Sequence, residues 1–598
     1  MKRLSLTLLL LPFFLTVSAQ SEKKIIILHT NDIHSRLNGY PRESTYSPLT
    51  TGNDLTMGGF SRIAAIIKTE KESNPGITLT VDAGDFLEGT LFYALEAQTG
   101  FQLSLMKKMG YDLVSIGNHE FEFGPEKLAG IINKSVSNGP IPNILSGNAL
   151  FSSTDPADDG LEKLYSAEVI GKKLIIEKDG LRIGFFSLLG VNAADVAPSA
   201  RPVKFAKQIP FAKKMVKELK SEKCDIIICV SHSGVTKDKN GMWSGEDVKL
   251  AESVRGIDVI ISGHTHTKLD KPIIINGIPV VQAGENGQYI GRISLTWSKG
   301  KLGLDDYNLI PADDNILGDS EVEELVKEQQ DLITRFILSP LGIKYSDPVA
   351  ETDFPLEFDI NGDLSASSLG PMVADAIHYY VNKHSADGCD VSMVAAGVIR
   401  DNFVPGVLSA PDIFSVMSLG TGSDNIPGYP LSRLYVTGKE LKNILEILQV
   451  AYKSTPDNFC YYSGLKVEYN PGRGLLKKLS RIDIVRSDGS IINVGFSKKN
   501  KTLYSITANS YMLEFVGIIK KMSFGLINVV PKDASGKPVT DMKNAVIDMN
   551  QSAPGTQEGK EWLALLEFIS SMKDQNGNGI PDIEKKYSVP VKTFFTAF

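Results

Sequence analysis

Side chains that bind metal ions cluster at five places in this chain of 598 residues, each where a short apolar run ends. In the first cluster, HTNDIH (29–34) directly follows the apolar run 25–28. Together the clusters offer these carboxylate, amide and imidazole ligands: Asp32, His34, Asp85, Asn118, His232, His264 and His266. This set lacks thiolates, suits Zn, Mn, Co or Fe, and is too rich in nitrogen for calcium. One polar cluster at a strand end is ordinary, but five in succession predict a shared metal site.

The number of candidate ligands is sufficient for two adjacent ions if one carboxylate bridges them. Two divalent ions about 3.5–4 Å apart bind a phosphate group and generate a hydroxide nucleophile between them. We therefore expect two divalent metal ions, of an identity that the residue types leave open, and hydrolysis of a phosphate ester.

The apolar runs that precede the clusters are typical of strands buried on both faces. They lie within 77–85, 112–120, 224–234 and 257–266, and helix-like segments such as 58–73 and 211–223 alternate with them. Alternating strands and helices predict an α/β layered domain. The carboxyl ends of parallel strands meet at one edge of a sheet, so the five clusters are expected to converge there.

The chain is longer than one hydrophobic core supports, so we expect two domains. The sequence divides into a signal peptide (1–19), a catalytic domain (24–310), a linker helix (319–342), a second α/β domain (349–549) and a tail (550–598). The helix at 319–342 has an alternative interpretation, in which it belongs wholly to one domain. Lys2 and Arg3 before an apolar run, with small residues near Ala19, predict export to the periplasm or the extracellular space.

Two further features concern partners. The net charge of −7 and the absence of a basic patch give no support for binding a nucleic-acid polymer, so the expected partner is a small phosphorylated molecule. No segment after the signal peptide is long and apolar enough to predict a membrane span.

The tail contains the stretch DQNGNGIPDIEKKY (574–587). Asp574, Asn576, Asn578 and Asp582 fall at the first, third, fifth and ninth positions of a calcium-binding loop. Lys585 stands at the twelfth position, where such loops have a bidentate Glu. The pattern therefore predicts weak calcium binding at most, and an ordinary Asn-Gly turn is the alternative.

The ordered motifs ILHTNDIH, VDAGDFLEGT, IGNHEFEFG, VSHSG, GHTHT and VQAGENGQYIGRI resemble those of the metallophosphoesterase superfamily. More narrowly, they resemble the exported 5′-nucleotidase family, which includes UDP-sugar hydrolases and 2′,3′-cyclic-nucleotide phosphodiesterases. The resemblance implies a four-layer α-β-β-α catalytic domain, a linker helix and a smaller α/β substrate-binding domain at the C-terminus.

The same resemblance implies a role for each candidate residue. One metal is assigned to Asp32, His34 and His266, the other to Asn118, His232 and His264, and Asp85 bridges them. His119 then faces the phosphate and stabilises charge that develops in the transition state. In the family an aspartate three residues later orients this histidine, and Glu122 occupies that position here.

The second domain resembles the family less closely. Arg400 is retained from the family's NGGGIR stretch and is expected to pair with a phosphate or carboxylate. Phe459 is the candidate for stacking on a nucleobase, with a buried core phenylalanine as the alternative. After ITANSY (506–511) the family's second aromatic and its GGDG stretch are missing, which leaves Tyr511 as the candidate second ring.

These patterns predict an exported phosphoesterase that hydrolyses nucleotides by attack of metal-activated water on phosphorus. A 2′,3′-cyclic-nucleotide phosphodiesterase and a UDP-sugar pyrophosphatase are the enzymatic alternatives. A metal-containing surface binding protein without turnover is the alternative outside enzymes.

Overall fold

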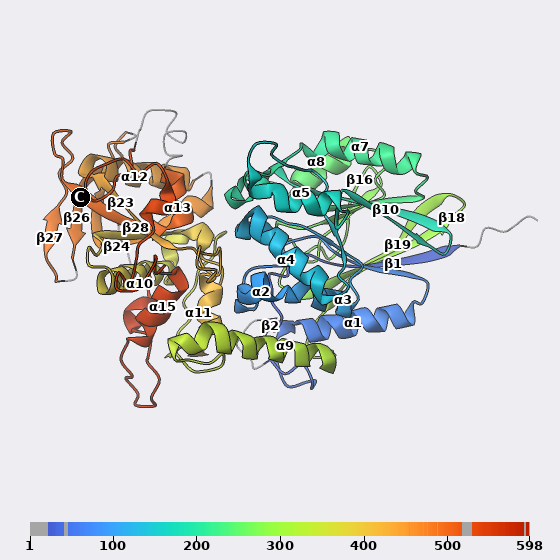
Figure 1. Ribbon diagram of the computed structural model, residues 1–598, viewed down its shortest axis with the longest axis horizontal. Helices are drawn as coiled ribbons and strands as arrows, with labels where there is room; N and C mark the ends of the chain where they lie inside the picture. Colours follow the sequence, from blue (N-terminus) through green and yellow to red (C-terminus); the bar gives the residue numbers. More distant parts are fainter. Residues whose placement is uncertain are drawn as a thin grey trace, which may run out of the picture.

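The computed structural model describes residues 22–40, 46–453, 455–470, 472–474, 476–486, 488–516, 529–590 and 594–596. The segment predicted as a signal peptide lies outside the described residues. The chain folds into two α/β domains that lie side by side, joined by a helix along one edge (Figure 1). Among the described residues, no helix has both the length and the apolar character that crossing a membrane requires.

Two large β-sheets form the core of the N-terminal domain. The first has seven strands in the order β19-β18-β1-β4-β5-β6-β8, and the second has six in the order β16-β17-β15-β12-β10-β9. The bounds of the first are β1 (Lys23–Thr30), β4 (Ile77–Asp82), β5 (Leu113–Ser115), β6 (Asn143–Leu145), β8 (Ile170–Gly171), β18 (Tyr289–Ser298) and β19 (Lys301–Pro311). Those of the second are β9 (Lys173–Lys178), β10 (Leu181–Leu189), β12 (Ile226–His232), β15 (Val259–Ser262), β16 (Ile273–Ile275) and β17 (Ile278–Val281).

Successive side chains along each strand point to opposite faces of the sheet, so one face packs against the other sheet and the second face packs against helices. In β1, Ile25 and Ile27 enter the core between the two sheets, whereas Ile26 and Leu28 pack under helices on the outer face. The outer helices are α1 (Phe60–Ser73), α3 (Phe101–Met109) and α4 (Gly124–Asn138) on the first sheet, and α7 (Gln208–Ser221) and α8 (Glu246–Ser253) on the second. Both faces of each sheet are therefore buried, and the predicted four-layer arrangement is confirmed.

The connecting helix α9 (Ser320–Ile333) begins at Asp319, whose side chain accepts hydrogen bonds from the backbone N–H groups of Glu321 and Val322. It packs against α1 and continues as further helical turns to Leu341 before the chain enters the second domain.

The C-terminal domain contains two four-stranded sheets. One comprises β23 (Leu431–Thr437), β28 (Leu503–Asn509), β21 (Val391–Ala395) and β24 (Cys460–Ser463) in that order. The other comprises β27 (Ile491–Asn493), β26 (Leu479–Val485), β25 (Leu465–Tyr469) and β29 (Phe594–Thr596). Its helices include α10 (Leu369–His384), α11 (Ala410–Val416), α12 (Gly438–Ala451) and α13 (Ser510–Val516).

The structure revises the domain boundary placed at residue 549. Helix α15 (Glu561–Ser570) packs against α10 and α11, and β29 pairs with β25. Trp562 is fully buried, and its indole N–H donates to the carbonyl of Pro427 at 2.8 Å. Because the apolar run in α15 needs a core to cover it, the segment expected as a tail completes the second domain.

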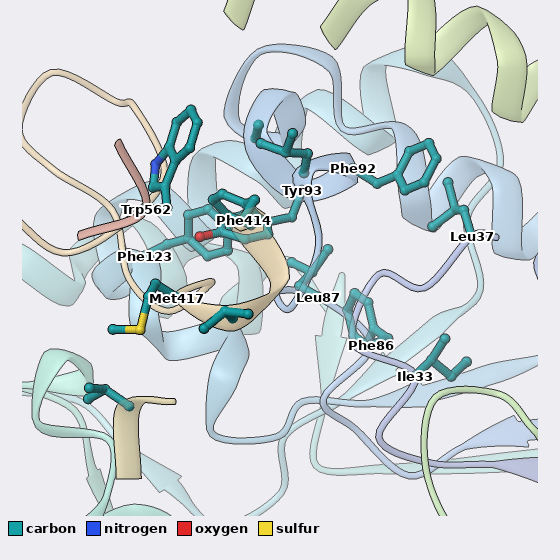
Figure 2. Close-up of a cluster of buried hydrophobic side chains, with 14 of the residues drawn as sticks. Ile33, Leu37, Phe86, Leu87, Phe92, Tyr93, Phe123, Phe414, Met417 and Trp562 are labelled. Carbon is teal, nitrogen blue, oxygen red and sulfur yellow. The ribbon is translucent and has the colours of Figure 1, made fainter. Parts of the chain in front are cut away.

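One hydrophobic cluster crosses between the domains. Figure 2 shows Tyr93 and Phe123 of the N-terminal domain beside Phe414 and Trp562 of the C-terminal domain. The ring centroids of Tyr93 and Phe414 lie 5.7 Å apart, and those of Phe414 and Trp562 lie 5.5 Å apart. This shared core fixes which loops of the second domain face the N-terminal sheet edge.

Candidate metal centre and active site

The candidate ligands follow strands of both sheets. Strands β1, β4 and β5 are parallel neighbours in the first sheet, and β12 and β15 are parallel neighbours in the second. Their carboxyl ends meet at one end of the sandwich, where all five clusters lie. A single sheet edge was expected from the sequence, whereas the structure assembles the site from two.

The first ligand group comprises Asp32, His34 and His266. The Nε2 atoms of the two histidines lie 3.1 Å apart, and Nε2 of His266 lies 3.5 Å from Oδ1 of Asp32. The other nitrogen of His266, Nδ1, lies 2.5 Å from Oε2 of Glu285. Since Glu285 accepts the Nδ1 proton, the Nε2 lone pair of His266 points toward its neighbours in the group.

The second group comprises Asp85, His232 and His264, with Asn118 beside them. Nδ1 of His232 donates to the carbonyl of Ala83 at 2.8 Å. Its Nε2 lies 3.0 Å from Oδ2 of Asp85 and 3.2 Å from Oδ1 of Asn118. The atoms Nε2 of His232, Oδ2 of Asp85 and Oδ1 of Asn118 therefore converge within the buried interior.

A neighbouring amide orients His264. Its Nε2 lies 2.9 Å from Oδ1 of Asn192, which leaves Nδ1 as the nitrogen available to a metal. Asp85 also belongs to a group with His34 and His119, so the two ligand groups are contiguous through this carboxylate.

The arrangement fits a pair of divalent cations. Converging lone pairs repel one another unless a positive charge lies between them. Burial lowers the pKa of His232, yet the carboxylate of Asp85 outweighs burial and raises the pKa to about 10, so this part of the site favours a positive charge. Backbone geometry adds a further sign, because five of the candidate ligands have φ between 52° and 76°: Asp32, His34, Asp85, His264 and His266. Such left-handed conformations are costly for these residues and concentrate at functional sites.

His119 lies beside the ligand groups at the start of a 3₁₀ turn (His119–Phe123). Its backbone N–H donates to Oδ1 of Asp85 at 2.8 Å, which fixes the turn against the proposed bridging carboxylate. Its Nδ1 lies 2.9 Å from Oε2 of Glu88, a residue that was not selected from the sequence.

Glu122, the partner that the sequence predicted for His119, is placed differently. Its Oε1 lies 3.9 Å from Nδ1 of His119, beyond hydrogen-bond distance, and its Oε2 accepts a hydrogen bond from the hydroxyl of Tyr429 in the second domain. The structure therefore corrects the assignment: Glu88 is the direct partner of the imidazole.

Arg400 belongs to the C-terminal domain and lies within electrostatic range of the ligand groups. Its side chain is exposed, and its positive charge lowers the pKa values of His34 and His119 after the larger effect of burial. The next residue, Asp401, pairs with Arg36 of the N-terminal domain at 2.8 Å. This buried ion pair joins the Arg400 segment to the N-terminal domain.

The two candidate stacking rings lie in the second domain. Phe459 is half-buried and makes edge contacts with Tyr452 and Tyr461, with ring centroids 5.1 Å away in each case. Tyr511 lies parallel to Tyr429, with centroids 5.2 Å apart and an angle of 16° between the rings. Tyr429 thus already covers one face of Tyr511. Base stacking by either ring stays a prediction.

The calcium-like loop lies in the second domain beside β20 (Ala350–Thr352). Asp574 accepts hydrogen bonds from the backbone N–H groups of Gly577 and Gly579, at 2.6 and 2.8 Å. The side-chain amides of Asn576 and Asn578 both donate to Oε1 of Glu351, a carboxylate that is distant in sequence. Weak calcium binding at Asp574, Asn576, Asn578 and Asp582 stays a prediction.

Three supporting residues were not identified from the sequence: Glu88, Asn192 and Glu285. Glu88 and Glu285 do lie within the quoted motifs VDAGDFLEGT and VQAGENGQYIGRI, so their position near the site could have been anticipated. Asn192 belongs to the short helix α6 (Val191–Asp195), and no pattern in the sequence marks it.

Comparisons with known proteins identify two families that match this chain. Residues 25–268 match the calcineurin-like phosphoesterase family, and residues 348–517 match the 5′-nucleotidase C-terminal domain. The chain is 26% identical to a 5′-nucleotidase of Vibrio vulnificus over 582 residues, which covers 90% of this chain and 93% of that relative. It is 24% identical to Protein 5NUC of Lutzomyia longipalpis over 542 residues, covering 83% and 86%.

Solved structures share the fold. A 5′-nucleotidase precursor from Thermus thermophilus superposes with a TM-score of 0.67 at 18% identity, covering 96% of this chain and 99% of that one. The sulfate thiohydrolase SoxB from Thermus thermophilus superposes with a TM-score of 0.60 at 17% identity, covering 96% of each chain. The architecture therefore recurs in proteins named for different chemistry, and function has to be inferred from the site.

Proposed function

Because this chain belongs to the 5′-nucleotidase family of the calcineurin-like superfamily, we propose that it is an exported dinuclear-metal phosphoesterase that hydrolyses nucleotides. The observation that carries the proposal is the pair of contiguous ligand groups that share Asp85, with His119 beside them. Binding without turnover does not require a buried imidazole that is oriented next to two metal sites. Export rests on the pattern of residues 1–19.

The chain's residues divide between two ions as follows: Asp32, His34 and His266 for one, Asn118, His232 and His264 for the other, and Asp85 for both. When bound, the ions would supply a water-derived nucleophile at neutral pH and offset the charge of the phosphoryl group. Glu285 and Asn192 orient the imidazoles of His266 and His264, so the lone pairs needed for coordination are already directed inward.

His119 acts on the substrate rather than on a metal. With Nδ1 held by Glu88, its Nε2 is the nitrogen available to a phosphoryl oxygen, where it stabilises charge that increases in the transition state. The guanidinium of Arg400 adds positive charge on the side of the second domain, which suits an anionic substrate held between the domains.

The nucleoside end of the substrate is assigned to the second domain. Phe459 offers a half-buried ring and Tyr511 offers one whose other face is covered by Tyr429. A stacked base is worth about 1–3 kcal/mol in nucleic-acid binders, enough to select nucleotides over simple phosphate esters. Hydrolysis of a 2′,3′-cyclic nucleotide or of a UDP-sugar is the alternative, because the second domain departs most from the family's pattern.

The test is a substrate panel with the purified chain and Mn²⁺ or Zn²⁺. Release of phosphate from AMP and UMP is measured with malachite green, and chromatography detects products from 2′,3′-cyclic AMP and UDP-glucose. His119→Ala should lower kcat by about 10²–10³-fold while the metal content stays unchanged. His384→Ala is the matched control, since that histidine pairs with Glu567 far from the site. Absence of turnover on every phosphoester would refute the proposal.

A further inference from the structure

Glu88 occupies an unusual position for a carboxylate. It lies in the loop after β4 that also carries Asp85, its side chain is almost fully buried, and its backbone has φ of 68°. A buried carboxylate in a left-handed conformation costs free energy twice, through desolvation and through backbone strain. Such a residue persists only where its contacts hold it.

Each oxygen of Glu88 has a different partner. Oε2 lies 2.9 Å from Nδ1 of His119, within the N-terminal domain. Oε1 accepts a hydrogen bond of 2.6 Å from the backbone N–H of Gly420, which belongs to the C-terminal domain. One carboxylate therefore contacts the imidazole beside the metal centre and the neighbouring domain at the same time.

The Gly420 segment is held in place by further contacts. The hydroxyl of Tyr93 lies 2.8 Å from the carbonyl oxygens of both Ser418 and Gly420. Gly420 has φ of 81°, and a Cβ atom there would collide with the ring of Tyr429. Only glycine fits at this position, so the direction of its N–H toward Glu88 is built into the packing.

Glu122 does not compete for this role. Its carboxylate is 3.9 Å from Nδ1 of His119 and accepts a hydrogen bond from Tyr429. Glu88 reaches Nδ1 of His119 directly, whereas Glu122 does not.

We propose that Glu88 is a positioning residue that holds the Nδ1 proton of His119, and that the N–H of Gly420, by binding the other oxygen of Glu88, couples the orientation of His119 to docking of the C-terminal domain. The expected effects on turnover rest on the proposed function. Its consequence is that the imidazole is fully oriented only while the second domain is docked, as it is in this structure.

The first test is a double-mutant cycle on AMP hydrolysis with Mn²⁺. Glu88→Gln should lower kcat about tenfold or more, and by no more than His119→Ala does, with KM changed far less. In the His119→Ala background the same substitution should have no further effect, since the residue acts through that imidazole. Glu446→Gln is the matched control: this carboxylate is also buried and accepts from the backbone N–H of Leu479, within the second domain. Equal losses with and without His119 would overturn the proposal.

The coupling to the second domain is tested with Tyr93→Phe, which removes the hydroxyl that holds residues 418–420. It should lower kcat severalfold in the wild type and have little effect when Glu88 is already Gln. Equal effects in both backgrounds would show that Tyr93 acts independently of Glu88 and would refute the coupling.

A readout independent of turnover uses ¹⁵N-labelled histidine in the zinc-loaded chain, with the His119 signals assigned by their loss in His119→Ala. A proton on Nδ1 is expected, whether or not Nε2 also carries one. An unprotonated Nδ1 would overturn the role of Glu88, even in a chain that hydrolyses nucleotides. If the wild type has no activity, the proposed function fails, and the state of Nδ1 still decides this inference.

Discussion

Glu285 should control the affinity of one of the two metal sites and leave the other unchanged. Its Oε2 lies 2.5 Å from Nδ1 of His266, which directs the Nε2 atom of that ring toward Asp32 and His34. Loss of such a supporting carboxylate typically costs 10–100-fold in metal affinity. The side chains of His266 and Glu285 retain 27% and 40% of their exposure, so solvent screens the pair. We therefore expect Glu285→Ala to weaken one site about tenfold, or ~1.4 kcal/mol.

The assay is calorimetric titration of Zn²⁺ into the metal-free full-length chain, fitted to two sites. Asn192→Ala provides the reciprocal perturbation, because Asn192 orients His264 of the other group. Glu324→Ala in α9 is the control for loss of an exposed glutamate far from the centre. The reasoning is refuted if Glu285→Ala binds both ions as the wild type does, or if it weakens both sites equally.

Three further predictions concern stability and docking. Trp562→Ala should lower the free energy of unfolding by about 3–5 kcal/mol in urea denaturation, because it empties a fully buried site. Wild-type stability would show that packing of Trp562 does not stabilise the second domain. Burial raises the pKa of Glu561 from 4.5 to about 8, so the folded chain binds this proton more tightly and wild-type stability should fall as the pH rises from about 4.5 to 8. Glu561→Gln should lessen that fall, and identical pH profiles in thermal unfolding would contradict the assignment. Asp401→Ala should cost the docked arrangement about 3–5 kcal/mol by leaving the buried guanidinium of Arg36 without its carboxylate. An increase in KM and a larger radius of gyration by X-ray scattering are expected, and no change in either would show that this pair does not stabilise docking.

His119 shows where prediction from local spacing reaches its limit. Glu122 follows His119 by three residues, and that spacing made it the expected partner. The chain forms a 3₁₀ turn there, which brings Glu122 near the ring. The carboxylate of Glu122, however, accepts a hydrogen bond from the hydroxyl of Tyr429, more than 300 residues later. Glu88 reaches the imidazole because β4 and β5 are parallel neighbours whose following loops meet.

The C-terminal segment illustrates the same limit on a larger scale. The apolar run of α15 is visible in the sequence, yet its position in the core depends on α10 and α11, whose residues lie about 150–200 positions earlier. Glu351 likewise meets the calcium-like loop only through the pairing of the chain near residues 351 and 582. Neither neighbour can be inferred from spacing along the chain.

The sequence by itself determined the ligand types at the candidate site and the layered α/β architecture. Ligand type is a property of single residues, and burial of strands on both faces is visible in short apolar runs, so both can be recognised locally. The tertiary structure decided the partnerships: which carboxylate contacts His119, how Glu285 and Asn192 direct the imidazoles, and which loop of the second domain lies nearest the ligand groups. Hydrogen bonds between side chains depend on distances of a few tenths of an ångström, and only the packing of both sheets and both domains sets those distances.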